Sequence, residues 1–193
     1  MDHDSYSDAY LRDILRGVRT IAIVGASEHW NRPSFFAMKY LQDKGYRVIP
    51  VNPQAKGEEI LGEKVYPSVR DVPVKIDMVD IFRRAEAVPP IVDDAIAIGA
   101  KVVWLQLGVR HDAAAAKAEA AGLQVVMNRC PKIEYGRLSS EIAWMGVNTR
   151  IISAKRATAG GIQRLSLNRA SAPGGATEAA ERAQREDSSA STS

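Results

Sequence analysis

The sequence predicts an α/β protein with three layers and a mainly parallel sheet. Short, continuous apolar runs, typical of strands buried on both faces of a sheet, alternate with helical stretches of about 10–13 residues. That alternation is typical of βαβ units. The 193 residues are enough for one domain with a core of its own. The pattern leaves one alternative open, an α+β domain with mixed strands.

The first helix is predicted over Ser7–Val18, where apolar residues recur at the helical spacing. The apolar run Thr20–Val24 predicts the first strand, and Gly25 ends it. A second helix begins at Pro33, since proline suits the first helical position, and Gly45 closes that helix.

The second strand is predicted over Arg47–Val51, where Asn52 stops it. The segment 54–74 is rich in turn residues. Within it, a short strand is predicted over Lys64–Tyr66, and one turn of helix is expected to start at Pro67.

Three strands and three helices are predicted after this segment. The strands are expected over Ile76–Phe82, Lys101–Leu107 and Leu123–Met127. The helices are expected over Pro89–Ile98 and Asp112–Ala121 and, more weakly, near Ser139–Met145. With five strands each followed by a helix or a turn-rich crossover, we expect a Rossmann-like three-layer sandwich.

The chain divides into three predicted segments. Residues 7–150 form the Rossmann-like domain, residues 151–170 a basic C-terminal extension without acidic residues, and residues 171–193 a disordered tail. The tail combines a Pro-Gly-Gly turn, an Ala/Glu/Arg stretch and a Ser/Thr end, which cannot bury enough apolar area to offset the entropy of ordering.

Composition excludes several classes of protein. A formal net charge of +3, without a basic patch, does not predict binding to nucleic acid. A single cysteine and three scattered histidines predict no disulfide framework and no metal site. The sequence has no signal-peptide pattern and no apolar run that could span a membrane. We therefore expect a cytoplasmic protein that binds neither metal nor membrane.

Ligands of open parallel sheets bind beyond the carboxyl ends of the strands. The first such loop, at Gly25, comes between a strand and a helix, where backbone N–H groups favour a phosphate. The spacing departs from G-x-G-x-x-G, because Ser27 and Trp30 take the second and third glycine positions. We expect the Ser27 hydroxyl to bind a phosphate oxygen instead.

The second loop bears on which cofactor binds. An enzyme that uses NAD needs an acidic residue at the end of the second strand for the ribose diol, and Val51–Pro53 contains none. Lys56 follows at a distance that could reach a ribose phosphate. NADP carries a 2′-phosphate and coenzyme A a 3′-phosphate, so both cofactors stay open.

Five segments at the predicted strand ends together resemble a known family. They are Val24–Ser27, Pro50–Pro53, Asp80–Arg83, Trp104–Gly108 and Asn128–Pro131. In this order they resemble the small bacterial CoA-binding proteins, which are similar to the N-terminal CoA-binding domain of the succinyl-CoA synthetase α subunit. The resemblance covers about residues 11–150.

The resemblance implies a site for coenzyme A or an acyl-CoA at the carboxyl ends of the strands. The candidate binding residues are Gly25, Ala26, Ser27, Asn52, Pro53, Lys56, Phe82, Arg83, Gln106, Gly108, Asn128 and Cys130. The sequence departs from the synthetase in three ways: the second glycine of the first loop is missing, Leu107 replaces an acidic residue, and no second domain with a phosphorylated histidine follows. The resemblance therefore implies binding, in a non-catalytic or regulatory role.

No catalytic residue is predicted. His111 is expected at the surface near a helix start. The basic neighbours Arg129 and Lys132 are expected to lower the pKa of the Cys130 thiol, but no triad spacing accompanies that thiol. Two other functions stay open: an NADP-dependent oxidoreductase, and an interaction subunit without a ligand that acts through its basic C-terminal extension.

Overall fold

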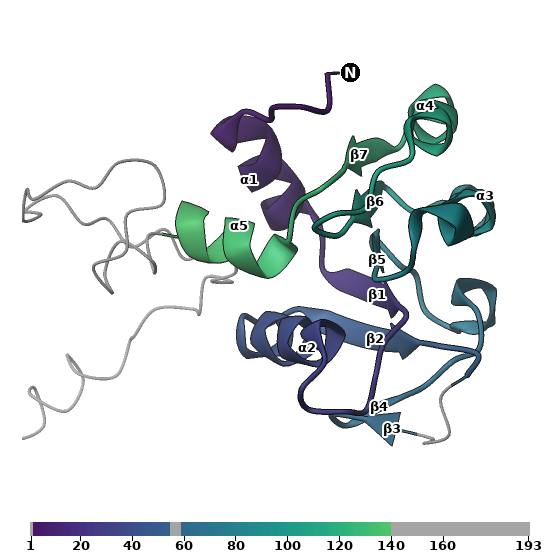
Figure 1. The fold of residues 1–193 in the computed structure, drawn as a ribbon. Coiled ribbons are helices and arrows are strands. Elements are labelled where there is room, and N and C mark those ends of the chain that lie inside the picture. The colour runs from purple at the N-terminus through teal and green to yellow at the C-terminus, as the bar shows by residue number, and fades with distance from the viewer. Residues whose placement is uncertain (1, 55–58, 140–193) are drawn as a thin grey trace, which may run out of the picture.

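The computed structural model describes residues 2–54 and 59–139 and contains a five-stranded parallel sheet (Figure 1). Its strands lie in the order β2-β1-β5-β6-β7, and every neighbouring pair is parallel. Their bounds are β1 Thr20–Val24, β2 Arg47–Val51, β5 Met78–Ile81, β6 Val102–Leu105 and β7 Gln124–Val126. All five predicted strands are present, and the predicted α/β fold is confirmed.

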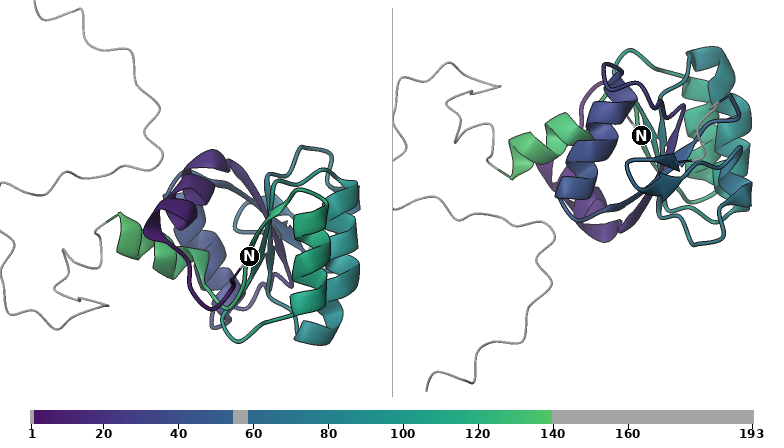
Figure 2. Two further views of the ribbon diagram at one scale, coloured as in Figure 1. Left: turned by 90° about the horizontal axis from the view of Figure 1, so that it is seen from above. Right: turned by 90° about the horizontal axis from the view of Figure 1, so that it is seen from below.

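Helices cover both faces of this sheet. Their bounds are α1 Asp8–Gly17, α2 Pro33–Asp43, α3 Val88–Ala97, α4 Asp112–Ala120 and α5 Pro131–Leu138. The two views of Figure 2 show α1, α2 and α5 on one face and α3 and α4 on the other, so the molecule has the three layers of a Rossmann-like fold. The core accordingly forms two clusters of buried side chains, one on each face of the sheet.

Strand residues alternate between these two clusters, as the pleat of a strand requires. In β1, Ile21 and Ile23 join the cluster under α1, α2 and α5, whereas Ala22 and Val24 join the other. Both faces of the strand are buried, which is why its sequence is a continuous apolar run. Asp80 of β5 interrupts this apolar pattern and is fully buried.

The segment between β2 and β5 carries only short elements. A two-stranded hairpin pairs β3, Glu59–Ile60, with β4, Glu63–Lys64. Of the predicted strand over Lys64–Tyr66, only Lys64 lies in β4, while Tyr66 forms a single parallel bridge to Val51. The predicted turn of helix is η1, Val69–Asp71, and a second turn, η2, covers Ala85–Ala87.

The sequence analysis did not predict the last helix of the described residues, α5, which begins at Pro131 and ends at Leu138. The weaker helix predicted near Ser139–Met145 lies outside the described residues from position 140 on. Proline at the first helical position fixes φ and loses no hydrogen bond there, so Pro131 starts the helix directly after the loop of β7. Residues 140–193 lie outside the described residues, and so do the predicted domain boundary at 150, the basic extension and the tail.

The order of the strands reverses at β1. The chain passes from β1 to β2 on one side and then returns to place β5 on the other side. This is the 2-1-3-4-5 order of one common doubly wound fold, in which ligands bind at the reversal, beyond the carboxyl ends of the strands. The loops that follow Val24 and Ile81 meet there.

Candidate functional site

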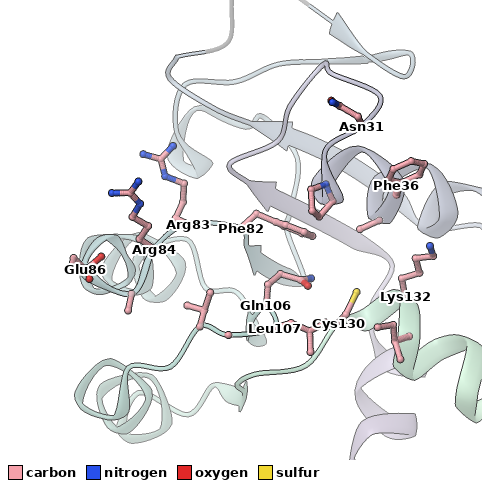
Figure 3. Close-up of a pocket in the computed structure, with 16 residues that line it drawn as sticks. Asn31, Phe36, Phe82, Arg83, Arg84, Glu86, Gln106, Leu107, Cys130 and Lys132 are labelled. Carbon is pink, nitrogen blue, oxygen red and sulfur yellow. The ribbon is translucent and has the colours of Figure 1, made fainter. Parts of the chain in front are cut away.

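A pocket of about 900 Å³ lies at the carboxyl ends of β5 and β6, beside the start of α2 and of α5 (Figure 3). Its lining is mostly apolar, with a few polar and charged groups. Lining residues include Phe36, Phe82, Arg83, Arg84, Gln106, Leu107, Gly108, Val109, Cys130, Lys132 and Ile133. An apolar pocket with few polar groups is the usual form of a small-molecule site.

A second hollow of about 250 Å³ lies on the other side of the strand-order reversal. It is lined by Gly25, Pro53, Val69, Ile91 and other residues between β1, η1 and α3. Arg83 lines both this hollow and the larger pocket. The two spaces therefore adjoin at Arg83, and together they extend along the loops that follow β1, β2, β5 and β6.

Seven of the twelve predicted binding residues line one of these two spaces. They are Gly25, Pro53, Phe82, Arg83, Gln106, Gly108 and Cys130. Four others, Ala26, Ser27, Asn52 and Asn128, are not among the lining residues and belong to the loops behind them. Lys56 lies outside the described residues. The structure thus brings most of the predicted residues together.

Gly25 is the point of closest approach between the first loop and the loop after β5. Its φ is +91°, and a Cβ atom placed on it would lie 2.8 Å from the carbonyl oxygen of Phe82 and 2.9 Å from Cδ of Arg83. Only glycine fits such a position. The tight turn expected at Gly25 is present, and it holds the two sides of the reversal together.

Two backbone N–H groups of this turn are already hydrogen-bonded to the neighbouring strand. The N–H groups of Gly25 and Ala26 both donate to the carbonyl oxygen of Val51, at 2.8 and 3.4 Å. The Ser27 hydroxyl oxygen accepts a hydrogen bond from the His29 N–H at 3.3 Å. The expectation that N–H groups around Gly25 favour a phosphate is therefore wrong for these two donors, because they join β1 to β2 instead.

Two asparagine side chains connect neighbouring loops of the site. Asn52 donates from Nδ2 to the Ala26 carbonyl oxygen at 2.8 Å, which ties the second loop to the first. Asn128, at φ +52°, accepts a hydrogen bond from the Gly108 N–H at 2.8 Å. Both residues position the loops, a role that sequence reasoning did not distinguish from ligand contact.

Positive charge gathers at the two ends of the large pocket. Figure 3 shows Arg83 and Arg84 at one end and Lys132 at the other, with Gln106, Leu107 and Cys130 between them. Glu86 lines the pocket beside the two arginines. Lys132 lies over the rings of Phe36 and Tyr40, at 5.9 and 5.7 Å from their centroids. The arginine end suits an anionic part of a ligand.

The environment of Cys130 differs from the sequence-based expectation. Its thiol lies at the N-terminus of α5, where backbone N–H groups of Lys132 and Ile133 favour the thiolate. Burial is the larger effect and raises the thiol pKa above its ordinary value, and the nearby Asp80 adds to the rise. The expectation of a lowered pKa is wrong for the net shift, because burial outweighs the lowering by Lys132. Arg129 contacts Glu134 and the Tyr6 ring instead of the thiol.

Asp80 and Gln106 form a buried pair that sequence reasoning missed. Gln106 donates from Nε2 to both carboxyl oxygens of Asp80, at 2.9 and 3.1 Å. Asp80 is fully buried and Gln106 is 6% exposed, and burial raises the pKa of Asp80 to about 8. The sequence signal was a carboxylate inside the apolar run Met78–Phe82.

No histidine of the described residues lines either of the two spaces. His111 caps α4, where its Nδ1 accepts a hydrogen bond from the Ala114 N–H at 3.1 Å, and His29 is exposed in the first loop. Within residues 2–54 and 59–139, no group of three His, Cys, Asp or Glu side chains could hold a metal ion. In the same residues, no helix combines the length and the apolar character needed to cross a bilayer.

A Rossmann-like sheet with an apolar pocket beyond the carboxyl ends of its strands is the arrangement in which α/β proteins commonly bind nucleotide-like ligands. Comparison with known families identifies the family within this class. Residues 19–136 match the CoA-binding domain family, so the chain belongs to that family.

The individual relatives fall into two groups. The protein YneT from Bacillus subtilis, which is uncharacterized, is 35% identical over 129 residues, 67% of this chain and 94% of YneT. The solved structure of a hypothetical protein from Pyrococcus horikoshii matches with a TM-score of 0.67 at 46% identity, over 72% of this chain and 96% of that chain.

The second group consists of much longer enzymes. Acetate–CoA ligase (ADP-forming) II from Archaeoglobus fulgidus is 34% identical over 98 residues, which are 50% of this chain and 14% of the ligase. The match to the CoA-binding domain family and to a CoA ligase confirms the resemblance to CoA-binding proteins inferred from the five strand-end segments.

Proposed function

We propose that this protein binds coenzyme A or an acyl-CoA across the strand-order reversal, in a non-catalytic or regulatory role. The observation that carries the proposal is the pair of spaces that adjoin at Arg83. One is a small hollow at Gly25 and Pro53, and the other is a larger apolar pocket that extends from Arg83 and Arg84 past Gln106 and Cys130 to Lys132. Membership in the CoA-binding family supports the choice of ligand.

The two spaces suit the two ends of coenzyme A. The adenosine end would occupy the small hollow, whose walls include Pro53, Val69 and Ile91. The diphosphate would lie beside Arg83 and Arg84, which can donate charge-assisted hydrogen bonds. The pantetheine arm would then follow the apolar pocket towards Cys130. This orientation explains why Arg83 lines both spaces.

The proposal assigns no catalytic residue to this chain. The ligases in its family are several times longer, and the chain spans 14% of the Archaeoglobus ligase. Their activity is therefore not transferred. An NADP-dependent oxidoreductase and an interaction subunit without a ligand are the two alternatives that an experiment must separate.

A thermal-shift panel tests the proposal against both alternatives. The melting temperature is measured with CoA, acetyl-CoA, NADP, NAD and ATP at equal concentrations. CoA or acetyl-CoA should raise it most, because a ligand at about 100 times its Kd stabilises the folded state by about 2.7 kcal/mol. Stabilisation by NADP without CoA would favour the oxidoreductase. No shift with any ligand would favour the interaction subunit.

A further inference from the structure

The Asp80–Gln106 pair lies beside the proposed path of the pantetheine arm, where Gln106 lines the pocket. Asp80 is in the central strand β5, and its register neighbours are Ile23 and Trp104, neither of which titrates. Gln106 follows β6, lines the pocket, and is the side chain that donates hydrogen bonds to Asp80 in the described part of the chain. The hydrogen bond to Asp80 therefore determines which end of the Gln106 amide, the N–H group or the carbonyl oxygen, faces the pocket.

The protonation state of Asp80 determines which amide atom of Gln106 forms the hydrogen bond with the Asp80 carboxyl group. An ionised carboxylate only accepts hydrogen bonds, so it holds Nε2 and leaves the carbonyl oxygen Oε1 facing the pocket. A neutral carboxyl has a hydroxyl that must donate, and the amide atom that can accept is Oε1. In that state the amide turns over and an N–H of Nε2 faces the pocket instead.

Burial favours the second state near neutral pH. A fully buried carboxylate with one amide neighbour is costly, and burial raises the pKa of Asp80 to about 8. Among the described residues, Asp80 interacts electrostatically with the Cys130 thiol at the N-terminus of α5, and that thiol in turn interacts with the Lys132 ammonium. Both the thiol and the ammonium must be controlled in any test.

We propose that Asp80 and Gln106 act as a proton-controlled amide switch that recognises a carbonyl group of the bound CoA or acyl-CoA. With neutral Asp80, Gln106 donates an N–H to an amide or thioester carbonyl of the ligand. With ionised Asp80, Gln106 presents an oxygen that repels the same carbonyl. Gln106 is then a specificity-determining residue, and Asp80 is the residue that positions it. This inference rests on the proposed function.

The inference predicts that ligand affinity falls as pH rises through the pKa of Asp80. The sign follows from linkage, since the ligand prefers the protonated form and apparent affinity scales with the fraction of protein in that form. With a pKa of about 8, the neutral fraction of Asp80 falls about tenfold between pH 7 and pH 9. The apparent Kd should therefore rise about tenfold over this range.

The test is calorimetric titration with S-methyl-CoA at pH 7 and pH 9. This thioether has no thiol that titrates, and a Cys130→Ser background removes the protein thiol. In that background the Kd should rise about tenfold. Asp80→Asn is the matched variant, because its amide group donates to Oε1 at every pH. It should bind at pH 7 about as tightly as the background protein and show the same Kd at pH 9.

A second variant keeps the result interpretable. Gln106→Leu removes the N–H donor, so its Kd should be raised at pH 7 and should not change further at pH 9. Melting temperatures confirm that each variant is folded. A background protein whose Kd is the same at both pH values, or an Asp80→Asn variant that retains the tenfold change, would overturn the inference. Absence of S-methyl-CoA binding at pH 7 would instead overturn the proposed function itself.

Discussion

Gly25 lies against Phe82 across the strand-order reversal, and a Cβ atom on Gly25 would be 2.8 Å from the Phe82 carbonyl oxygen. The contact joins the loops that follow β1 and β5, two of the strands whose following loops line the site. Backbone atoms cannot give way as a flexible side chain can. The close approach therefore requires glycine at this position.

Gly25→Ala should destabilise the fold more than an alanine at a matched glycine elsewhere. Gly122, with φ +86°, has no atom within 4 Å of the position that a Cβ would take, so Gly122→Ala carries the backbone strain alone. That strain costs roughly 1–3 kcal/mol, and Gly25→Ala adds a clash with Phe82. Urea unfolding measures both. Equal losses of free energy of unfolding would show that the contact with Phe82 is unimportant.

Asp80→Asn should stabilise the protein, and more so as pH rises. Burial raises the folded-state pKa of Asp80 from 3.8 to about 8. The contribution of Asp80 to stability is thus fully present below its unfolded pKa and is lost as pH rises towards 8. Asparagine carries no such penalty. The difference in free energy of unfolding should grow by roughly 3 kcal/mol between pH 5 and pH 7.5, at about 1.4 kcal/mol per pH unit.

Asp77, immediately before β5, provides the control of opposite sign. It accepts hydrogen bonds from the N–H groups of Arg19 and Thr20 and pairs with Lys101 at 2.8 Å. These partners hold its pKa below the ordinary value. Asp77→Asn should therefore destabilise the protein at pH 7 and have less effect at low pH. If both substitutions changed stability in the same direction, the account of Asp80 would be wrong.

Cys130 should react slowly with iodoacetamide at neutral pH. Its thiol pKa is raised by burial and by Asp80, and the thiolate is the reactive form. Because this is the only cysteine in the chain, the urea-unfolded protein provides the reference rate. Above pH 8, Asp80→Asn should speed the reaction of the folded protein, since it removes a nearby negative charge. CoA should slow it.

Two results would contradict this account of the thiol. A folded protein that reacts as fast as the unfolded one would mean that burial does not protect Cys130. Unchanged rates in the presence of CoA, at a concentration that saturates the protein, would mean that the pantetheine arm does not reach the end of the pocket.

Arg83→Ala should weaken CoA binding at least about tenfold, because a hydrogen bond to a charged group contributes roughly 1.5–3 kcal/mol. Arg47→Ala is the matched control. Arg47 begins β2 at the opposite edge of the sheet, where it pairs with Glu63 at 3.4 Å. Equilibrium dialysis with labelled CoA compares the two. Equal affinities of the two variants would remove Arg83 from the proposed diphosphate site.

The sequence predicts the architecture better than the chemistry of the site. The apolar run Thr20–Val24 and the positions of Gly25 and Pro33 suffice to locate β1 and the start of α2, because these signals are local. The pKa of the Cys130 thiol, by contrast, depends on residues that are distant in the sequence. Its sequence neighbour Arg129 turns to Glu134, while Asp80, fifty residues earlier, comes close only once the sheet is formed.

The same limit explains why the Asp80–Gln106 pair was missed. An Asp or a Gln in or after an apolar strand does not by itself indicate a partner. Only the pairing of β5 with β6 brings these two side chains together. Likewise, Asn52 and Asn128 follow strands as ligand-binding residues do, but their side chains join neighbouring loops. Partners distant in the sequence decide such roles.

Direct calorimetric titration of the full chain with CoA, with NADP in parallel, tests the central claim. We predict one CoA site per chain and much weaker or undetectable binding of NADP. Prior saturation with CoA should abolish any residual NADP signal, because both nucleotides would use the hollow at Gly25 and Arg83. Binding of NADP by a protein that gives no heat with CoA would contradict the claim.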